Sequence, residues 1–84
     1  MKHVVLYARE GCCLCDDARE MLERIRARHP DALAVTERDI ESDEALLRRY
    51  LERIPVIAID GVEALELQID ETELELRLGI VRAG

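Results

Sequence analysis

The chain has 84 residues, of which 49% are hydrophobic and 37% are charged, and its formal net charge is −7. A chain of this length is expected to form one domain, over residues 1–84. The negative charge argues against a nucleic-acid-binding module, which needs a basic patch to neutralise phosphate. No stretch approaches the roughly 20 apolar residues of a membrane span, and the first residues do not resemble a signal peptide. We therefore expect a cytoplasmic protein without a membrane partner.

The first half of the chain predicts a strand, a helix and a second strand. Residues 4–7 (Val-Val-Leu-Tyr) are apolar, mostly β-branched or aromatic, and have charged residues on both sides, which predicts a short, fully buried strand. From Cys13 onward, apolar residues recur at steps of three and four, as on an amphipathic helix; they are Leu14, Ala18, Met21, Leu22 and Ile25. Pro30 ends this helix, because proline disfavours helical geometry in the residue before it. Residues 33–40 then predict the second strand.

A second helix is expected after Ser42, which offers an N-cap, and it should run to about Arg53. Its predicted buried side consists of Ala45, Leu46, Leu47, Tyr50 and Leu51. Residues 56–59 predict a third strand. Asp60-Gly61 is typical of a type I′ hairpin turn, since both residues tolerate a positive φ. A fourth strand should therefore return antiparallel to about Leu67.

The last segment has two possible periodicities. Alternating leucines fit a strand, whereas Leu74, Leu78 and Val81 fit the stripe of a helix. Asp70 followed by Glu73 resembles a capping box, and we therefore predict a short helix over residues 71–78. The complete order is β-α-β-α-β-β-α, an α/β fold in which a four-stranded mixed sheet is flanked by helices. The first two strands, joined by a helix, should be parallel with a right-handed crossover.

All three cysteines lie in one short window, Cys12-Cys13-Leu14-Cys15. Such clustering excludes a disulfide framework and indicates redox-active or metal-binding cysteines. Cys12 falls at the start of the predicted helix, where free N–H groups and the helix dipole favour a thiolate. Cys15 follows one turn later, within reach of Cys12 but more enclosed, so the pair suits a nucleophile and a resolving thiol. Asp16 and Asp17 in the same turn oppose a thiolate at Cys12.

Other interpretations of the cysteine cluster remain open at this point. The three thiols could hold a metal or an iron–sulfur cluster, for example across a dimer. Cys13 is expected to be a spare exposed thiol, with a metal-ligating or regulatory role as the alternative. His3 and His29 are far from the cluster in sequence and are expected at the surface, which gives a Cys/His zinc site little support.

These features together resemble the thioredoxin superfamily and, within it, the glutaredoxin-like proteins. The resemblance covers nearly the whole chain and is carried by residues 7–15 (Tyr-Ala-Arg-Glu-Gly-Cys-Cys-Leu-Cys), residues 53–56 (Arg-Ile-Pro-Val) and the hairpin at 60–61. It implies a thioredoxin/glutaredoxin fold and a thiol–disulfide oxidoreductase with Cys12 and Cys15 as its redox pair. Further implications are a monomer without a cofactor, a disulfide-containing protein or glutathione as partner, and glutathione as a candidate co-substrate.

The resemblance also implies roles for three residues outside the cysteine cluster. Pro55 matches the family's cis-proline, and the backbone of Ile54 would pair with an extended substrate. Arg9 would favour the thiolate and receive a carboxylate of glutathione. In one respect the chain departs from glutaredoxins: residues 65–71 lack the glycine pair that grips glutathione in that family. A thioredoxin-fold scaffold that contacts a partner through the Ile54-Pro55 loop without turnover is a third hypothesis.

Overall fold

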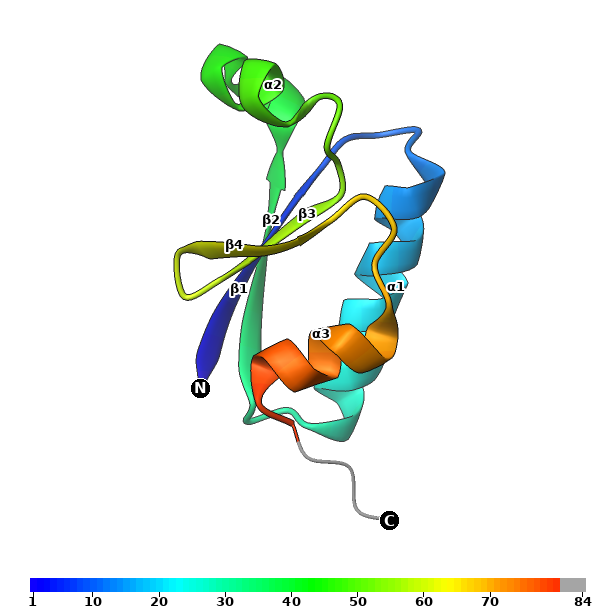
Figure 1. Cartoon of the computed structure of the whole chain (residues 1–84), viewed down its shortest axis with the longest axis vertical. Coiled ribbons are helices and arrows are strands. Elements are labelled where there is room, and N and C mark those ends of the chain that lie inside the picture. Colours follow the sequence, from blue (N-terminus) through cyan, green and yellow to red (C-terminus); the bar gives the residue numbers. More distant parts are fainter. Residues whose placement is uncertain (81–84) are drawn as a thin grey trace.

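The computed structural model describes residues 1–80 and contains a four-stranded sheet with helices packed around it (Figure 1). The element order is the predicted β-α-β-α-β-β-α, with a short 3₁₀ turn, Ile40–Ser42, before the second helix. The elements are β1 (Lys2–Ala8), α1 (Cys13–Arg28), β2 (Leu33–Asp39), α2 (Glu44–Tyr50), β3 (Val56–Ile59), β4 (Val62–Glu66) and α3 (Glu71–Leu78).

The sheet has the strand order β2-β1-β3-β4. β1 pairs with β2 in parallel, whereas β3 is antiparallel to both β1 and β4, so the predicted mixed sheet is confirmed. Asp60 and Gly61 join β3 to β4 with φ values of 50° and 84°, as the hairpin prediction requires. Within residues 1–80, no helix is long and apolar enough to cross a bilayer.

β1 is buried fully on one face only, which corrects the prediction of a fully buried strand. Val4, Leu6 and Ala8 are at most 1% exposed, while Val5 and Tyr7 on the opposite face are only partly buried. The reason lies in α2, which has only seven residues and sits at one end of the molecule, away from α1 and α3 (Figure 1). Of its residues, Tyr50 is the one that is buried, and the Tyr50 ring stacks on that of Tyr7 on the second face of β1.

The second helix begins later and ends earlier than the sequence suggested. Asp43, not Ser42, is the N-cap, and its carboxylate accepts the N–H of Ala45 at 2.8 Å. The Ser42 hydroxyl instead donates to the Asp39 carbonyl at 2.6 Å, inside the 3₁₀ turn that takes over from β2. The expected buried side was wrong at Ala45, which is exposed in the first turn, and at Leu51, which is exposed after the helix ends at Tyr50.

α3 has the predicted bounds and is tied to α1 by charge. The Asp70 carboxylate caps it by accepting the N–H of Glu73 at 3.1 Å. Glu71 accepts hydrogen bonds from Arg24 at 2.9 Å and Arg28 at 3.0 Å, both on α1. These bonds lower the pKa of Glu71 from its ordinary value. These contacts hold the start of α3 against the second half of α1, at a distance along the helix from the cysteines at its N-terminus (Figure 1).

Candidate redox site

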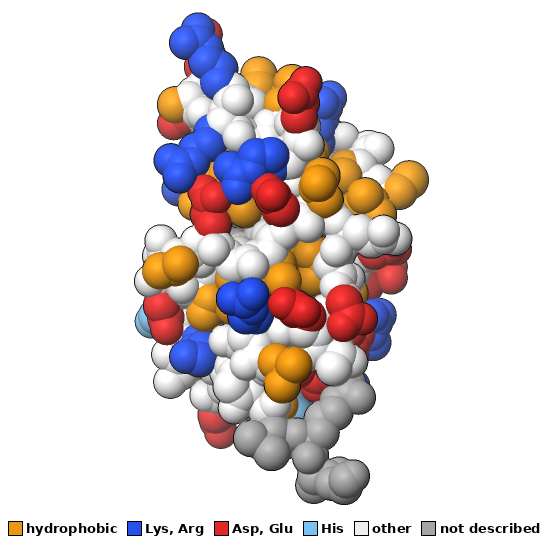
Figure 2. All heavy atoms as spheres, viewed as in Figure 1, with side chains coloured by type: hydrophobic (Ala, Val, Ile, Leu, Met, Phe, Trp, Pro, Cys, Tyr) orange, Lys and Arg blue, Asp and Glu red, His pale blue; other side chains and the backbone are white. Residues whose placement is uncertain are grey.

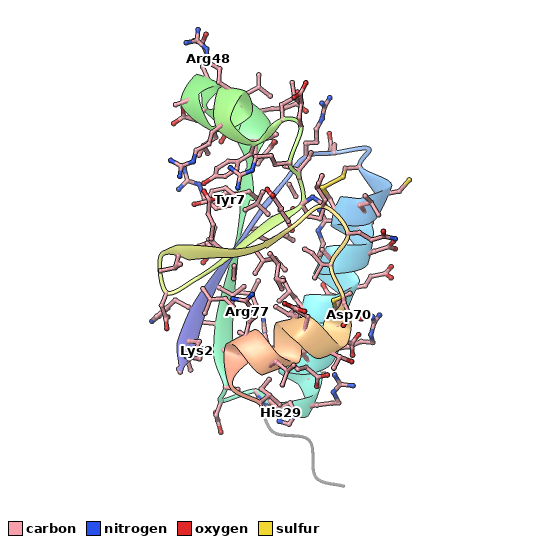
Figure 3. The ribbon with its side chains drawn as sticks, viewed as in Figure 1. Lys2, Tyr7, His29, Arg48, Asp70 and Arg77 are labelled. Carbon is pink, nitrogen blue, oxygen red and sulfur yellow. A yellow bond between two sulfur atoms is a disulfide. The ribbon has the colours of Figure 1, made fainter. Side chains whose placement is uncertain are left out.

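A disulfide joins Cys12 and Cys15 where the chain enters α1 (Figure 3). Gly11, with φ of 78°, makes the turn from β1. Cys12 is then the N-cap of α1, where its sulfur accepts the N–H of Cys15 at 3.1 Å and its carbonyl accepts the N–H of Asp16 at 3.0 Å. The two Cα atoms are 5.1 Å apart, within the range of disulfides. The sulfur of Cys12 therefore lies at the positive end of the helix dipole.

The three cysteines differ in their access to solvent. Cys15 is 0% exposed and belongs to the hydrophobic core, whereas Cys12 is partly buried against that core. Cys13 is a free, exposed thiol, as expected. A partner can therefore approach the disulfide only from the Cys12 side.

The Ile54-Pro55 loop is buried and held from two sides. Its peptide bond is cis, the isomer expected for Pro55, and Ile54 packs in the same core cluster as Cys15. The Ile54 N–H donates to the carbonyl of Tyr50 at 3.0 Å. The N–H of Leu67, the residue after β4, donates to the Pro55 carbonyl at 2.9 Å and to the Arg53 carbonyl at 3.2 Å. The loop is thus fixed relative to both α2 and β4 before any substrate arrives.

Behind this loop lies a network of side chains that sequence reasoning missed. Glu63 of β4 accepts hydrogen bonds from the Tyr50 hydroxyl at 2.9 Å, from Arg49 at 2.9 Å and from Arg53 at 2.5 Å. Arg53 also bonds Glu66 at 2.5 Å, and the guanidiniums of Arg49 and Arg53 both lie 5.4 Å from the centre of the Tyr50 ring. We call Glu63 with Arg49, Tyr50 and Arg53 the Glu63 network.

The electrostatics of the Glu63 network follow from its geometry. The hydrogen bond from Arg53, followed by that from Tyr50, lowers the pKa of Glu63 to about 2. Burial, followed by the bond to Glu63, raises the pKa of Tyr50 above its ordinary value. One part of the network could have been predicted from the sequence, because Arg49 and Arg53 lie four residues apart with Tyr50 between them. Glu63 could not have been predicted as their partner, because its position beside them depends on how β4 pairs with β3.

Two charged neighbours predicted to tune Cys12 are themselves engaged. Arg9 forms an ion pair with Glu41 in the 3₁₀ turn, with 3.3 Å between Nε and Oε1. Asp16 pairs with Arg19 at 2.6 Å, and Arg19 also forms two hydrogen bonds with Glu37 of β2. The charge of Asp16 beside the cysteines is therefore largely compensated. Its neighbour Asp17 has no such partner among residues 1–80.

No metal centre is assembled in the part of the chain that the structure describes. Over residues 1–80, no three His, Cys, Asp or Glu side chains are grouped so as to hold an ion. His3 is exposed and His29 is partly buried at the C-terminal end of α1. Cys12 and Cys15 bond each other, which leaves Cys13 as the free cysteine.

Comparison with known proteins agrees with this geometry. A family model described as a glutaredoxin-like domain (DUF836) matches residues 3–79. The X-ray structure of the structural-genomics target protein XcR50 from X. campestris is 33% identical, with a TM-score of 0.76, over 90% of this chain and 95% of that one. A mutant thioredoxin from Halobacterium salinarum NRC-1 is 20% identical with a TM-score of 0.69, over 92% and 71% of the two chains, and shows the fold alone. No curated protein matches the chain.

Proposed function

Because the chain belongs to the family of glutaredoxin-like domains, we propose that it is a cytoplasmic thiol–disulfide oxidoreductase that works through Cys12 and Cys15. The observation that carries the proposal is the Cys12–Cys15 disulfide at the N-terminus of α1, with one sulfur accessible and the other enclosed. Thiolates at helix N-termini and in Cys-x-x-Cys motifs are stabilised and therefore react at neutral pH. A metal-binding role lacks any comparable support within residues 1–80.

The reduced protein would act in two exchange steps. The Cys12 thiolate attacks one sulfur of the substrate disulfide, that S–S bond breaks, and the first substrate thiolate leaves and takes up a proton. Cys15 then gives up its proton and attacks the sulfur of Cys12, which releases the second substrate thiol. Two electrons have passed to the substrate, and the protein holds the Cys12–Cys15 disulfide. Because Cys15 is 0% exposed, its reaction is restricted to the sulfur of Cys12.

The surroundings of Cys12 support both steps. The N–H of Cys15 points at the sulfur of Cys12 and, with the helix dipole, stabilises negative charge there. The Ile54 N–H already donates to the Tyr50 carbonyl. The Ile54 carbonyl is therefore the group that would accept a hydrogen bond from a substrate N–H. The substrate is a disulfide-containing protein or glutathione, the protein acts as a monomer, and glutathione or a reductase returns it to the dithiol form.

The test uses one variant for each cysteine. The protein is equilibrated in glutathione redox buffers and then assayed for reduction of a disulfide-linked peptide, with the products identified by mass spectrometry. We expect a reversible Cys12–Cys15 disulfide in the wild type. Cys15→Ser should accumulate a mixed disulfide at Cys12, and Cys13→Ser should keep activity within about twofold. Cys12→Ser should fall to background, and full activity of this variant would overturn the proposal.

A further inference from the structure

A groove of about 390 Å³ lies between α1 and the segment that connects β4 to α3. Leu14, which stands between Cys13 and Cys15, forms its end nearest the disulfide, and Ile69 lies on the connecting segment. Ala18 and Met21 of α1 complete its apolar lining. Figure 1 shows the connecting segment running alongside the first half of α1. We call this groove, lined by Leu14, Ala18, Met21, Gln68 and Ile69 together with the charged residues described next, the α1 groove.

The charge of the α1 groove is unbalanced. Asp17 and Glu20 line it and, over the described range 1–80, form no hydrogen bond or ion pair. Arg24 also lines the groove, but its guanidinium is bound to Glu71 at 2.9 Å. The groove therefore has an apolar floor, two exposed carboxylates that have no ion-pair partner within residues 1–80, and one arginine that is already paired with Glu71. On the right-hand side of Figure 2, hydrophobic side chains at the level of the start of α1 are followed further down by acidic ones.

Two exposed leucines stand near the disulfide and near the Ile54-Pro55 loop: Leu14 lies within the cysteine window, and Leu67 follows β4. Leu14 is 41% exposed and Leu67 is 45% exposed, while the backbone N–H of Leu67 bonds the Pro55 carbonyl. Leu67 also has φ of 62°, a conformation that costs a non-glycine residue energy and is found where the surrounding structure requires it. Leu14 thus presents apolar surface at the disulfide end of the α1 groove, and Leu67 presents apolar surface next to the Ile54-Pro55 loop.

We propose that the α1 groove binds the polypeptide of a protein disulfide substrate through an apolar side chain beside the reactive cysteine and a basic side chain beyond it. The proposal rests on the function proposed above and specifies its substrate class. Leu14 and Ile69 accept the apolar side chain, and Asp17 and Glu20 pair with Lys or Arg. The dithiol protein passes two electrons to the substrate, becomes the Cys12–Cys15 disulfide, and leaves the substrate with two thiols.

The same charges distinguish this substrate from glutathione. Glutathione carries two carboxylates and one ammonium, so each half of its disulfide is a net anion. Asp17 and Glu20 repel it, and Arg9, the cation predicted to receive its carboxylate, is held by Glu41. Charges at the rim of a binding surface act mainly on the rate of association and on its dependence on salt. We therefore expect a higher kcat/KM for a disulfide in a basic protein segment than for the disulfide of glutathione.

The experiment compares two peptide disulfides that differ only in charge. Each is a homodimer of a short peptide with a central cysteine flanked by leucine, and the outer residues are lysine in one and glutamate in the other. A self-quenching fluorophore on each half reports reduction by the dithiol protein. We expect kcat/KM to be about tenfold higher for the lysine peptide at low salt, as two weak ion pairs would give. The ratio should approach one in 1 M salt, where the screening length is about 3 Å.

Variants locate the effect within the molecule. Asp17→Asn/Glu20→Gln should lower kcat/KM for the lysine peptide about three- to tenfold and raise it for the glutamate peptide. The control, Glu23→Gln/Asp31→Asn, removes the same charge from exposed positions that do not line the α1 groove and should change the ratio by less than about twofold.

The outcomes separate this inference from the proposed function. If the wild type reduces both peptides equally, or if the control pair changes the ratio as much as the groove pair, the α1 groove is not the docking site. The disulfide chemistry would still hold in either case. If the wild type reduces neither peptide and Cys12 and Cys15 do not cycle in a glutathione buffer, the proposed function itself fails.

Discussion

Behind the Ile54-Pro55 loop, Glu63 accepts hydrogen bonds from Arg49, Tyr50 and Arg53, whereas in the α1 groove Asp17 and Glu20 have no partner within residues 1–80. The two sets of carboxylates have different surroundings. The Glu63 network joins α2, the loop and β4 through side chains, in addition to the backbone hydrogen bonds of the loop. The paired carboxylate is expected to stabilise the fold, and the two carboxylates of the α1 groove are proposed to bind a partner.

Removing the ring of Tyr50 should give the largest effect, because this ring is the centre of the Glu63 network. It is 4% exposed, stacks on Tyr7 at 4.4 Å between ring centroids and lies under both arginines. Tyr50→Ala should lower the free energy of unfolding by about 3–5 kcal/mol, the usual cost of deleting a buried aromatic. Urea unfolding followed by circular dichroism measures it.

Two controls sharpen this prediction. Tyr50→Phe keeps the stacking and loses only the hydroxyl bond to Glu63, so it should cost about 1 kcal/mol. Asp17→Asn/Glu20→Gln in the α1 groove should change stability by less than about 0.5 kcal/mol, as is usual for surface positions. If Asp17→Asn/Glu20→Gln lowered the free energy of unfolding as much as Tyr50→Ala does, the contrast between paired and unpaired carboxylates would be wrong.

The pH dependence of stability should separate the two regions as well. The folded-state pKa of Glu63 is about 2, below its unfolded value of 4.5, so its contribution is fully present above pH 4.5 and is lost as the pH falls toward 2. The urea midpoint of the wild type should therefore fall between pH 4.5 and pH 2. Glu63→Gln should have a lower midpoint at pH 7, and its difference from the wild type should shrink across that window. A difference that stays constant would contradict this assignment.

The parts of the fold that the sequence predicted are those where a local pattern determines the structure. The Asp60-Gly61 turn, the Asp70 cap and the 3.6-residue period of α1 each depend on neighbours along the chain, and all three appear as predicted. The cysteine window likewise placed Cys12 at a helix start. Local patterns were misleading at α2, where Asp43 and Ser42 are both good caps and only the 3₁₀ turn decides between them.

Most of the charged surroundings of the site could not be predicted, because the ion pairs between elements depend on how strands and helices are placed against one another. Asp16 was expected to oppose a thiolate at Cys12, but Arg19, which is fixed to Glu37 on β2, compensates it. Arg9 was expected beside the substrate, and its ion pair with Glu41 depends on the turn after β2. Glu63 meets its partners only because β4 returns beside β3. Arg19 lies only three residues from Asp16 on α1, but Glu37, Glu41 and the partners of Glu63 all lie in other segments of the chain.

A smaller effect, on the reactivity of Cys12, is expected when Asp16 loses its ion pair. Asp16 would then be an unpaired carboxylate, like Asp17 and Glu20 in the α1 groove. Arg19→Gln removes the partner of Asp16 and leaves its charge beside Cys12. Alkylation of Cys12 by iodoacetamide in the reduced protein at pH 7 should slow by up to about fivefold, the size of a weak charge interaction. Mass spectrometry of the alkylated Cys12 peptide measures the rate. Arg26→Gln, on the same helix but without a charged partner in the described chain, should leave that rate unchanged.

The smallest effect on stability is expected for an isolated ion pair on the surface, which no further side chain joins. Arg48 and Glu44 lie four residues apart on α2 at 2.7 Å, with 77% and 74% of their side chains exposed, and Arg48 is at the far tip of the molecule (Figure 3). Solvent screens such a pair, so Arg48→Gln should change the free energy of unfolding by less than about 0.5 kcal/mol in urea titrations. A loss close to that of Tyr50→Ala would mean that ion pairing by itself stabilises this fold. If the expected result is found, an ion pair within one helix adds little stability. The Glu63 network would then stabilise the fold because two arginines and a tyrosine all bind one carboxylate that belongs to a different element, β4.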